Sequence, residues 1–177
     1  MSVDFSLDYF ALFGLPRRFG IDEADLDRAW RALQTEVHPD RHARLPGDER
    51  HHAMRGALRV NEAYATLKKP LPRARYLLGL AGIDAEDIDC APMAPGFLIE
   101  QMEWREAVEE ARAFADVDAL EQLAMRLRMH IDEVTAFLAE QFDARRDDKA
   151  AADTVRRLMF LDKLRRDIDD GLAALDG

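Results

Sequence analysis

Hydrophobic residues recur along most of the chain at intervals of three and four, which is the spacing of one face of an α-helix. Alternating apolar and polar runs rich in Val, Ile and Thr, which would indicate β-strands, are missing, and Ala, Leu, Glu and Arg dominate. The sequence therefore predicts an all-α protein. The expected helices span residues 9–13, 22–37, 49–67, 72–80, 97–115, 117–142 and 148–175.

The helical pattern is interrupted between Gly79 and Gly96, where glycines, prolines and acidic residues replace the periodic apolar positions. Such a change in composition is typical of a domain boundary. We expect an N-terminal domain over residues 1–79, a linker over 80–95 and a C-terminal domain over 96–177. Short connections between the three long amphipathic helices of the second part favour an antiparallel three-helix bundle.

Charge is divided unevenly between these two parts. Of the total net charge of −10, residues 1–79 contribute +2 and residues 80–177 contribute −12. An acidic surface repels phosphate backbones, so we do not expect the second part to bind nucleic acid. No apolar run approaches the ~20 residues that span a bilayer, so no membrane association is expected. The single cysteine, Cys90, offers neither a disulfide nor a paired-cysteine metal site, and we expect no metal and no cofactor.

The candidate site of the first part is the turn His38-Pro39-Asp40, between the helices expected over residues 22–37 and 49–67. Proline cannot continue a helix and disfavours helical geometry in the residue before it, so the preceding helix must stop here. The turn then presents polar side chains, with arginines nearby on the preceding helix and in the loop. His38 and Asp40 could serve as a general base and its orienting acid, but a catalytic site would also need a nucleophile or a phosphate-binding loop. The sequence contains neither motif, so no catalytic residue is assigned. The candidate residues are His38, Pro39, Asp40, Arg28, Arg31 and Arg41.

The helix expected over residues 97–115 carries two apolar clusters instead of one. At about 100° per residue, one stripe forms the natural core face. That stripe consists of Phe97, Gln101, Trp104, Val108, Ala111 and Ala115. A second cluster lies on the opposite side, among acidic residues: Leu98, Ile99 and Met102 with Glu103, Glu106 and Glu110. Because a bundle needs only one buried stripe per helix, an apolar cluster rimmed by charge indicates a partner site.

In the last expected helix, Phe160 falls off the line through Leu158 and Leu161. We expect Phe160 to extend the second apolar cluster.

Together these features resemble the HscB family, the J-domain co-chaperones of iron–sulfur cluster assembly. The similarity to a J domain lies in Asp8-Tyr9-Phe10, the His38-Pro39-Asp40 turn and the stretch from Asn61 to Pro70. The similarity to the C-terminal bundle of the family lies in residues 97–103, 151–158 and 160–164. The resemblance implies a J domain, built as a helical hairpin with short flanking helices, joined to the three-helix bundle.

The resemblance also implies two partners. The J domain would stimulate the ATPase of an HscA-type heat-shock chaperone through the turn and its arginines. The bundle would deliver the iron–sulfur scaffold IscU through Leu98, Ile99, Met102, Glu103, Glu106, Glu110 and Phe160. The chain lacks the N-terminal paired cysteines of mitochondrial relatives, so a bacterial-type, cytoplasmic, non-enzymatic protein without structural zinc is expected. A general J-domain protein with a different client remains the alternative, and the oligomeric state stays open.

Overall fold

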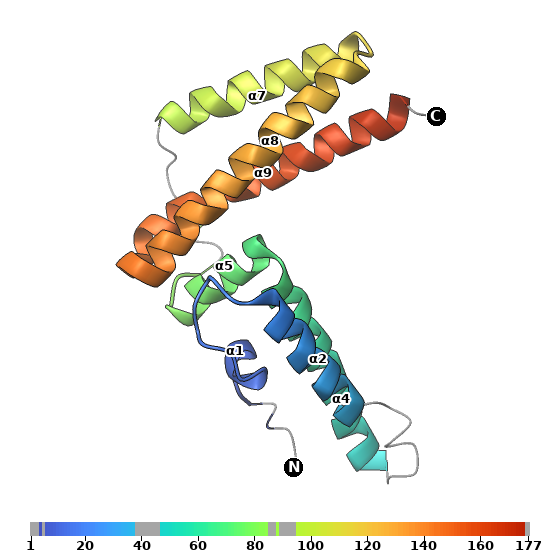
Figure 1. The fold of residues 1–177 in the computed structure, drawn as a ribbon, viewed down its shortest axis with the longest axis vertical. Coiled ribbons are helices and arrows are strands. Elements are labelled where there is room, and N and C mark those ends of the chain that lie inside the picture. The colour runs from blue at the N-terminus through green and yellow to red at the C-terminus, as the bar shows by residue number, and fades with distance from the viewer. Residues whose placement is uncertain (1–3, 5, 38–46, 85–87, 89–94, 176–177) are drawn as a thin grey trace. The chain divides into compact units, whose positions relative to one another are not determined.

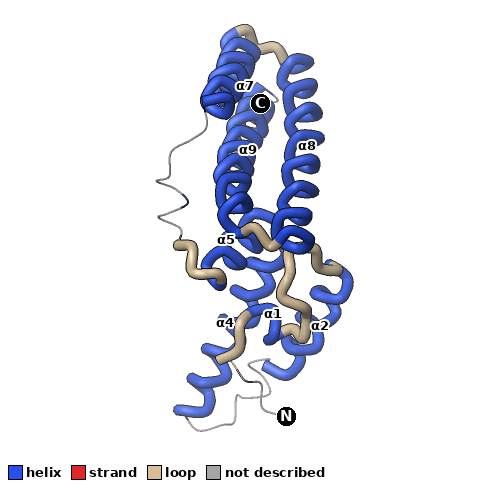
Figure 2. Tube along the Cα trace, turned by 90° about the vertical axis from the view of Figure 1, so that its left-hand side faces the viewer, coloured by secondary structure: helices blue, strands red, loops and turns tan. Residues whose placement is uncertain are grey.

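The computed structural model describes residues 4, 6–37, 47–84, 88 and 95–175, and all of its regular elements are helices (Figures 1 and 2). The predicted all-α fold, with a helical hairpin in the first part and a bundle in the second, is confirmed. The chain divides into two compact units, residues 1–77 and 78–177. Residues 85–87 and 89–94 of the expected linker, including Cys90, lie outside the described residues. In the part that is described, no helix combines the length and the apolar character needed to cross a membrane.

The N-terminal unit is built around the helical hairpin of α2 and α4 (Figure 1). Its helices are α1 (Tyr9–Leu12), α2 (Glu23–Val37), α4 (Gly47–Lys68) and the greater part of α5 (Pro70–Leu80). Asp22 caps α2, because its side chain accepts hydrogen bonds from the backbone N–H groups of Ala24 and Asp25. Helix α5 begins at Pro70, two residues before the predicted start, because proline suits the first turn of a helix. The core includes Phe10, Phe19, Leu26, Val60, Ala63, Leu67 and Ala74.

A polar and aromatic cluster ties α2 to α4 near the end of α4. The carboxylate of Asp27 accepts hydrogen bonds from Lys68 at 2.8 Å and from the Tyr64 hydroxyl at 2.9 Å. The Tyr64 ring stacks on Trp30, with ring centroids 4.6 Å apart. The hydrogen bonds from Lys68 and Tyr64 lower the pKa of Asp27, and the bond to Asp27 raises the pKa of Tyr64. Trp30 and Tyr64 are both partly exposed, at the edge of the hairpin.

The C-terminal unit contains three long helices that lie alongside one another (Figure 2). They are α7 (Pro95–Ala113), α8 (Val117–Ala139) and α9 (Asp148–Leu175). The most extensive helix–helix contact is between α8 and α9, whereas α7 contacts each of them less. The buried apolar side chains of this seam are Leu120, Leu123, Leu127, Val134, Leu138, Ala151, Val155, Leu158, Leu161, Leu164 and Ile168.

Two local predictions in this unit are corrected. The helix expected to run to Phe142 leaves α-helical geometry after Ala139 and continues as a π-helix, η1 (Glu140–Arg145). Arg146 then takes a left-handed conformation, with φ 53°, that ends the segment. Ala115, assigned to the core stripe of the preceding helix, lies beyond the end of α7, is exposed and also has φ 53°. It belongs to the turn whose next residue, Asp116, caps α8.

The Asp27 cluster makes the stability of the N-terminal unit depend on pH. Because folding lowers the pKa of Asp27 from 3.8, its carboxylate stabilises the folded state above that value. The stabilisation is lost as the pH falls through the lower pKa of the folded state. We expect Asp27→Asn to lower the melting temperature at pH 7, and the difference from wild type to shrink steadily below pH ~4.

Trp30 fluorescence in a Trp104→Phe background measures this melting, because Trp30 stacks within the cluster. The control is Asp25→Asn, which removes a carboxylate whose side chain is 49% exposed and pairs with Arg28 only along the helix. A pH-independent loss of stability in Asp27→Asn would contradict the prediction.

Candidate functional site

The first predicted surface is described only on α2. Four of its residues, His38, Pro39, Asp40 and Arg41, lie outside the described residues. Arg28 and Arg31 are exposed and stand one turn apart on α2. The guanidinium of Arg28 pairs with Asp25 at 2.8 Å, but its side chain is 73% exposed. An ion pair of this kind contributes little stability, so Arg28 can exchange it for an acidic group on another molecule at small cost.

The second predicted surface is an apolar patch on α7 that faces away from the bundle. Leu98, Ile99 and Met102 are 46%, 58% and 70% exposed, whereas Val108 and Ala111 on the opposite side of the helix are buried. The two apolar clusters of α7 therefore separate into a buried face and an exposed face. We call Leu98, Ile99 and Met102 the apolar patch.

Acidic side chains border the apolar patch. Glu103, Glu106 and Glu110 are all exposed on the same side of α7. They follow one another at three- and four-residue steps, so they form a continuous ridge beside the patch. The arrangement matches a protein contact site with an apolar centre and a charged rim.

Phe160 of α9 makes packing contacts that its sequence position did not reveal. It is only partly exposed, because its ring meets Phe97 of α7 edge to face with centroids 5.8 Å apart. The guanidinium of Arg105 lies 5.6 Å from the centroid of the Phe160 ring. Phe160 thus packs α7 against α9. Arg105, which sequence reasoning missed, lies between Phe97 and the apolar patch on the helical wheel of α7.

A polar cluster on the other side of α7 joins all three helices of the unit. Oε1 of Glu100 lies 2.8 Å from Nε2 of His130 on α8, and Oε2 of Glu100 accepts a hydrogen bond from Arg157 on α9 at 2.6 Å. Arg157 and His130 approach each other to 3.3 Å. We call Glu100, His130 and Arg157 the three-helix cluster. The sequence analysis did not single out these three residues, because no local pattern links positions on three helices.

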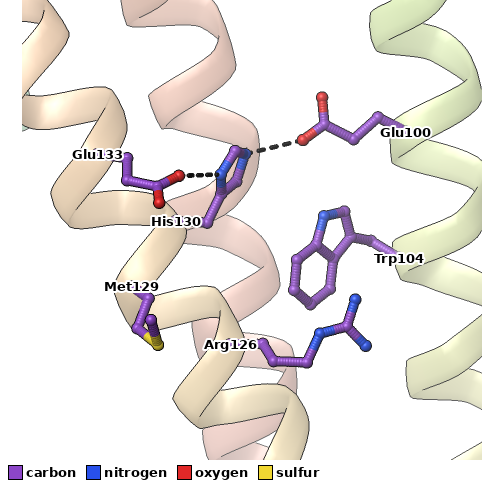
Figure 3. A pocket seen from close by; sticks show the side chains of 6 residues that line it. All are labelled: Glu100, Trp104, Arg126, Met129, His130 and Glu133. Carbon is purple, nitrogen blue, oxygen red and sulfur yellow. Dashed lines mark hydrogen bonds and ion pairs between the residues drawn. The ribbon is translucent and has the colours of Figure 1, made fainter.

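Beside this cluster, a shallow pocket of about 300 Å³ opens between α7 and α8 (Figure 3). The guanidinium of Arg126 lies 5.2 Å from the centre of the Trp104 ring, and Glu133 approaches His130 to 3.5 Å. Within the described ranges, no group of three or more His, Cys, Asp or Glu side chains could hold a metal ion. The pocket is lined by Glu100, Trp104, Arg126, Met129, His130 and Glu133.

Residues 93–169 match the family described as HSCB C-terminal oligomerisation domain. The chain is 58% identical to the co-chaperone protein HscB homologue of Azoarcus sp. (strain BH72), over 99% of both chains. The chain belongs to the HscB family of co-chaperones. The chaperone HscB from Vibrio cholerae is 39% identical and superposes with a TM-score of 0.84, over 96% of this chain and 99% of that one. The human co-chaperone protein HscB is 30% identical, with a TM-score of 0.86 over 94% and 82% of the two chains.

The HscB family membership confirms the resemblance that the sequence indicated. It also confirms the predicted function, that of a co-chaperone in iron–sulfur cluster assembly. Both parts of the chain are covered by these similarities, so the hairpin unit and the bundle unit belong to one conserved architecture. The two described surfaces, the basic face of α2 and the apolar patch of α7, are the candidates for its contacts with other proteins.

Because Phe160 packs against Phe97 and Met102 is exposed, we expect truncation of Phe160 to destabilise the bundle more than truncation of Met102 does. We expect Phe160→Ala to lower the free energy of unfolding of the bundle by about 2 kcal/mol, because it removes partly buried apolar area and an edge-to-face aromatic pair. Met102→Ala, at an exposed position, should change the same quantity by less than about 0.5 kcal/mol. Urea unfolding followed by circular dichroism measures both. Equal effects of the two substitutions would show that the Phe97–Phe160 contact does not stabilise the bundle.

Proposed function

We propose that this protein couples an HscA-type chaperone to an IscU-type scaffold through two separate surfaces. The N-terminal unit stimulates ATP hydrolysis by the chaperone, and the C-terminal unit binds the scaffold and delivers it. The observation that carries the proposal is the exposed apolar patch of α7 with its acidic ridge, in a chain of the HscB family. Folding of the bundle does not require this patch, since α7 already buries its opposite face.

The chaperone contact is assigned to the His38-Pro39-Asp40 turn together with Arg28, Arg31 and Arg41. The exposed arginines of α2 support this assignment, because cations on one helix face attract an acidic partner surface and speed its approach. The hairpin that carries these arginines is joined at its edge by the Asp27 cluster. The protein hydrolyses nothing itself in this scheme and acts in the cytoplasm.

The scaffold contact is assigned to seven residues of α7 and α9. The apolar patch and Phe160 supply the centre, where loss of a side chain speeds dissociation. The acidic ridge supplies the rim, which sets the association rate and its dependence on salt. The assigned residues are Leu98, Ile99, Met102, Glu103, Glu106, Glu110 and Phe160.

The chaperone half of the proposal is tested by single-turnover ATP hydrolysis on an HscA-type chaperone, with and without IscU. We expect stimulation that increases with IscU and disappears in His38→Gln. His51→Gln is the matched control, because His51 is an exposed histidine on α4 outside the assigned surface. Stimulation that does not respond to IscU would favour the alternative, a J-domain protein with a different client. No stimulation of the chaperone would refute the proposal.

The scaffold half is tested by the double variant Leu98→Ala, Met102→Ala. We expect the Kd for IscU to rise about tenfold or more, because both side chains lie at the apolar centre. Calorimetric titration measures the Kd at fixed salt. Met125→Ala is the matched control, since Met125 is 66% exposed on α8 and lies outside the assigned surface. An unchanged Kd in the double variant would refute the assignment of the patch.

A further inference from the structure

We infer that the three-helix cluster of Glu100, His130 and Arg157 is a positioning device that holds the apolar patch of α7 in its binding-competent place. The inference rests on the proposed function and deepens it, because none of the three residues belongs to the proposed contact surface. It concerns how tightly the bundle binds its scaffold partner.

Helix α7 is weakly attached to the rest of the bundle. Helices α8 and α9 share a long apolar seam, whereas the buried side chains of α7 are Gln101, Val108 and Ala111. Two of these side chains are small and one is polar. Apolar burial on α7 is therefore modest, and it falls mostly on the C-terminal half of the helix.

The two ends of α7 are held in different ways. At its C-terminal end the chain turns directly into α8, where Asp116 donates from its backbone N–H to Ala111 and caps α8 with its side chain. Toward the N-terminal end, the described contacts include those of Glu100, the edge-to-face pair of Phe97 and Phe160, and the approach of Arg105 to the Phe160 ring. The apolar patch lies at this second end, within one turn of Glu100.

The geometry of Glu100 is that of a residue that fixes the position of α7 against α8 and α9. Its two carboxylate oxygens face two different helices, His130 of α8 at 2.8 Å and Arg157 of α9 at 2.6 Å, and its side chain is only 22% exposed. The Arg157 guanidinium also lies 5.9 Å from the centroid of the Phe97 ring. A partly buried, charge-assisted bond with two partners defines position more narrowly than apolar contact does. Figure 3 shows Glu100 and Trp104 on α7 facing His130 and Arg126 on α8.

Loss of the Glu100 charge would leave Arg157 without its carboxylate partner and let the N-terminal half of α7 leave its place against α8 and α9. Leu98, Ile99 and Met102 would then occupy the binding arrangement only part of the time. A partner that binds one arrangement loses affinity in proportion to the fraction of molecules that hold it.

The test is the Kd for IscU of Glu100→Gln, with Glu121→Gln on the exposed surface of α8 as matched control. We expect a rise in Kd of roughly tenfold for Glu100→Gln, which corresponds to a competent fraction of about one tenth. The control should bind as the wild type does. Arg157→Met should weaken binding likewise, and Arg157→Lys, which keeps the charge, should restore most of it. Circular dichroism establishes that each variant is folded.

Two readouts separate positioning from a general loss of structure. Trp104 lies one turn from Glu100 beneath Arg126, so its emission in a Trp30→Phe background should change in Glu100→Gln before any scaffold is added. In addition, Leu98→Ala should raise the Kd by the same factor in the Glu100→Gln and wild-type backgrounds, since Glu100→Gln changes the fraction of molecules in the binding arrangement and not the contacts made within it.

Three outcomes are decisive. Wild-type affinity in Glu100→Gln, together with weakened binding in Leu98→Ala, would overturn the inference and leave the proposed function intact. A much smaller effect of Leu98→Ala in the Glu100→Gln background than in the wild-type background would overturn it as well, because the variant would then bind without using the patch. No binding of IscU by the wild-type protein would instead refute the proposed function and remove the inference with it.

Discussion

The apolar seam between α8 and α9 is the contact on which the C-terminal unit depends. It runs along both helices and contains fully buried residues such as Leu127, Leu138 and Leu161. Since burial of a side chain of this size contributes about 2 kcal/mol, the seam is the largest apolar contribution to the stability of this unit. Helix α7 can therefore use its surface for another purpose, and its outward face carries apolar and acidic side chains that folding does not need.

The N-terminal unit likewise has a buried apolar core and a separate exposed face. The hairpin of α2 and α4 buries Leu26, Val60 and Leu67 inside, while the outer face of α2 carries exposed arginines. The Asp27 cluster joins the two helices at the hairpin edge through Tyr64 and Lys68. In each unit an apolar core supplies stability, and a small polar cluster joins the helices outside that core.

Charge distribution separates the two surfaces further. The basic face lies in the mildly positive N-terminal part, and the acidic ridge of α7 lies in the strongly negative C-terminal part. Surfaces of opposite sign on one chain favour two different partners and disfavour exchange of one partner for the other. A protein with this arrangement is suited to bring two molecules together.

Helical periodicity in the sequence determined the helices, the all-α class and the two faces of α7, because burial follows the helical repeat wherever one stripe packs against neighbours. Periodicity did not predict that α7 ends before Ala115 or that α8 ends at Ala139, because the backbone geometry changes at both places without a change in apolar spacing. The exposure of Leu98, Ile99 and Met102 followed from the same repeat.

The three-helix cluster and the Phe97–Phe160 contact were decided only by the tertiary structure. Glu100, His130 and Arg157 are separated by 27 residues or more along the chain, and each alone reads as an ordinary surface residue. Their meeting depends on the relative rotation and register of α7, α8 and α9. Those quantities arise from the packing of whole helices, and no local sequence pattern specifies them.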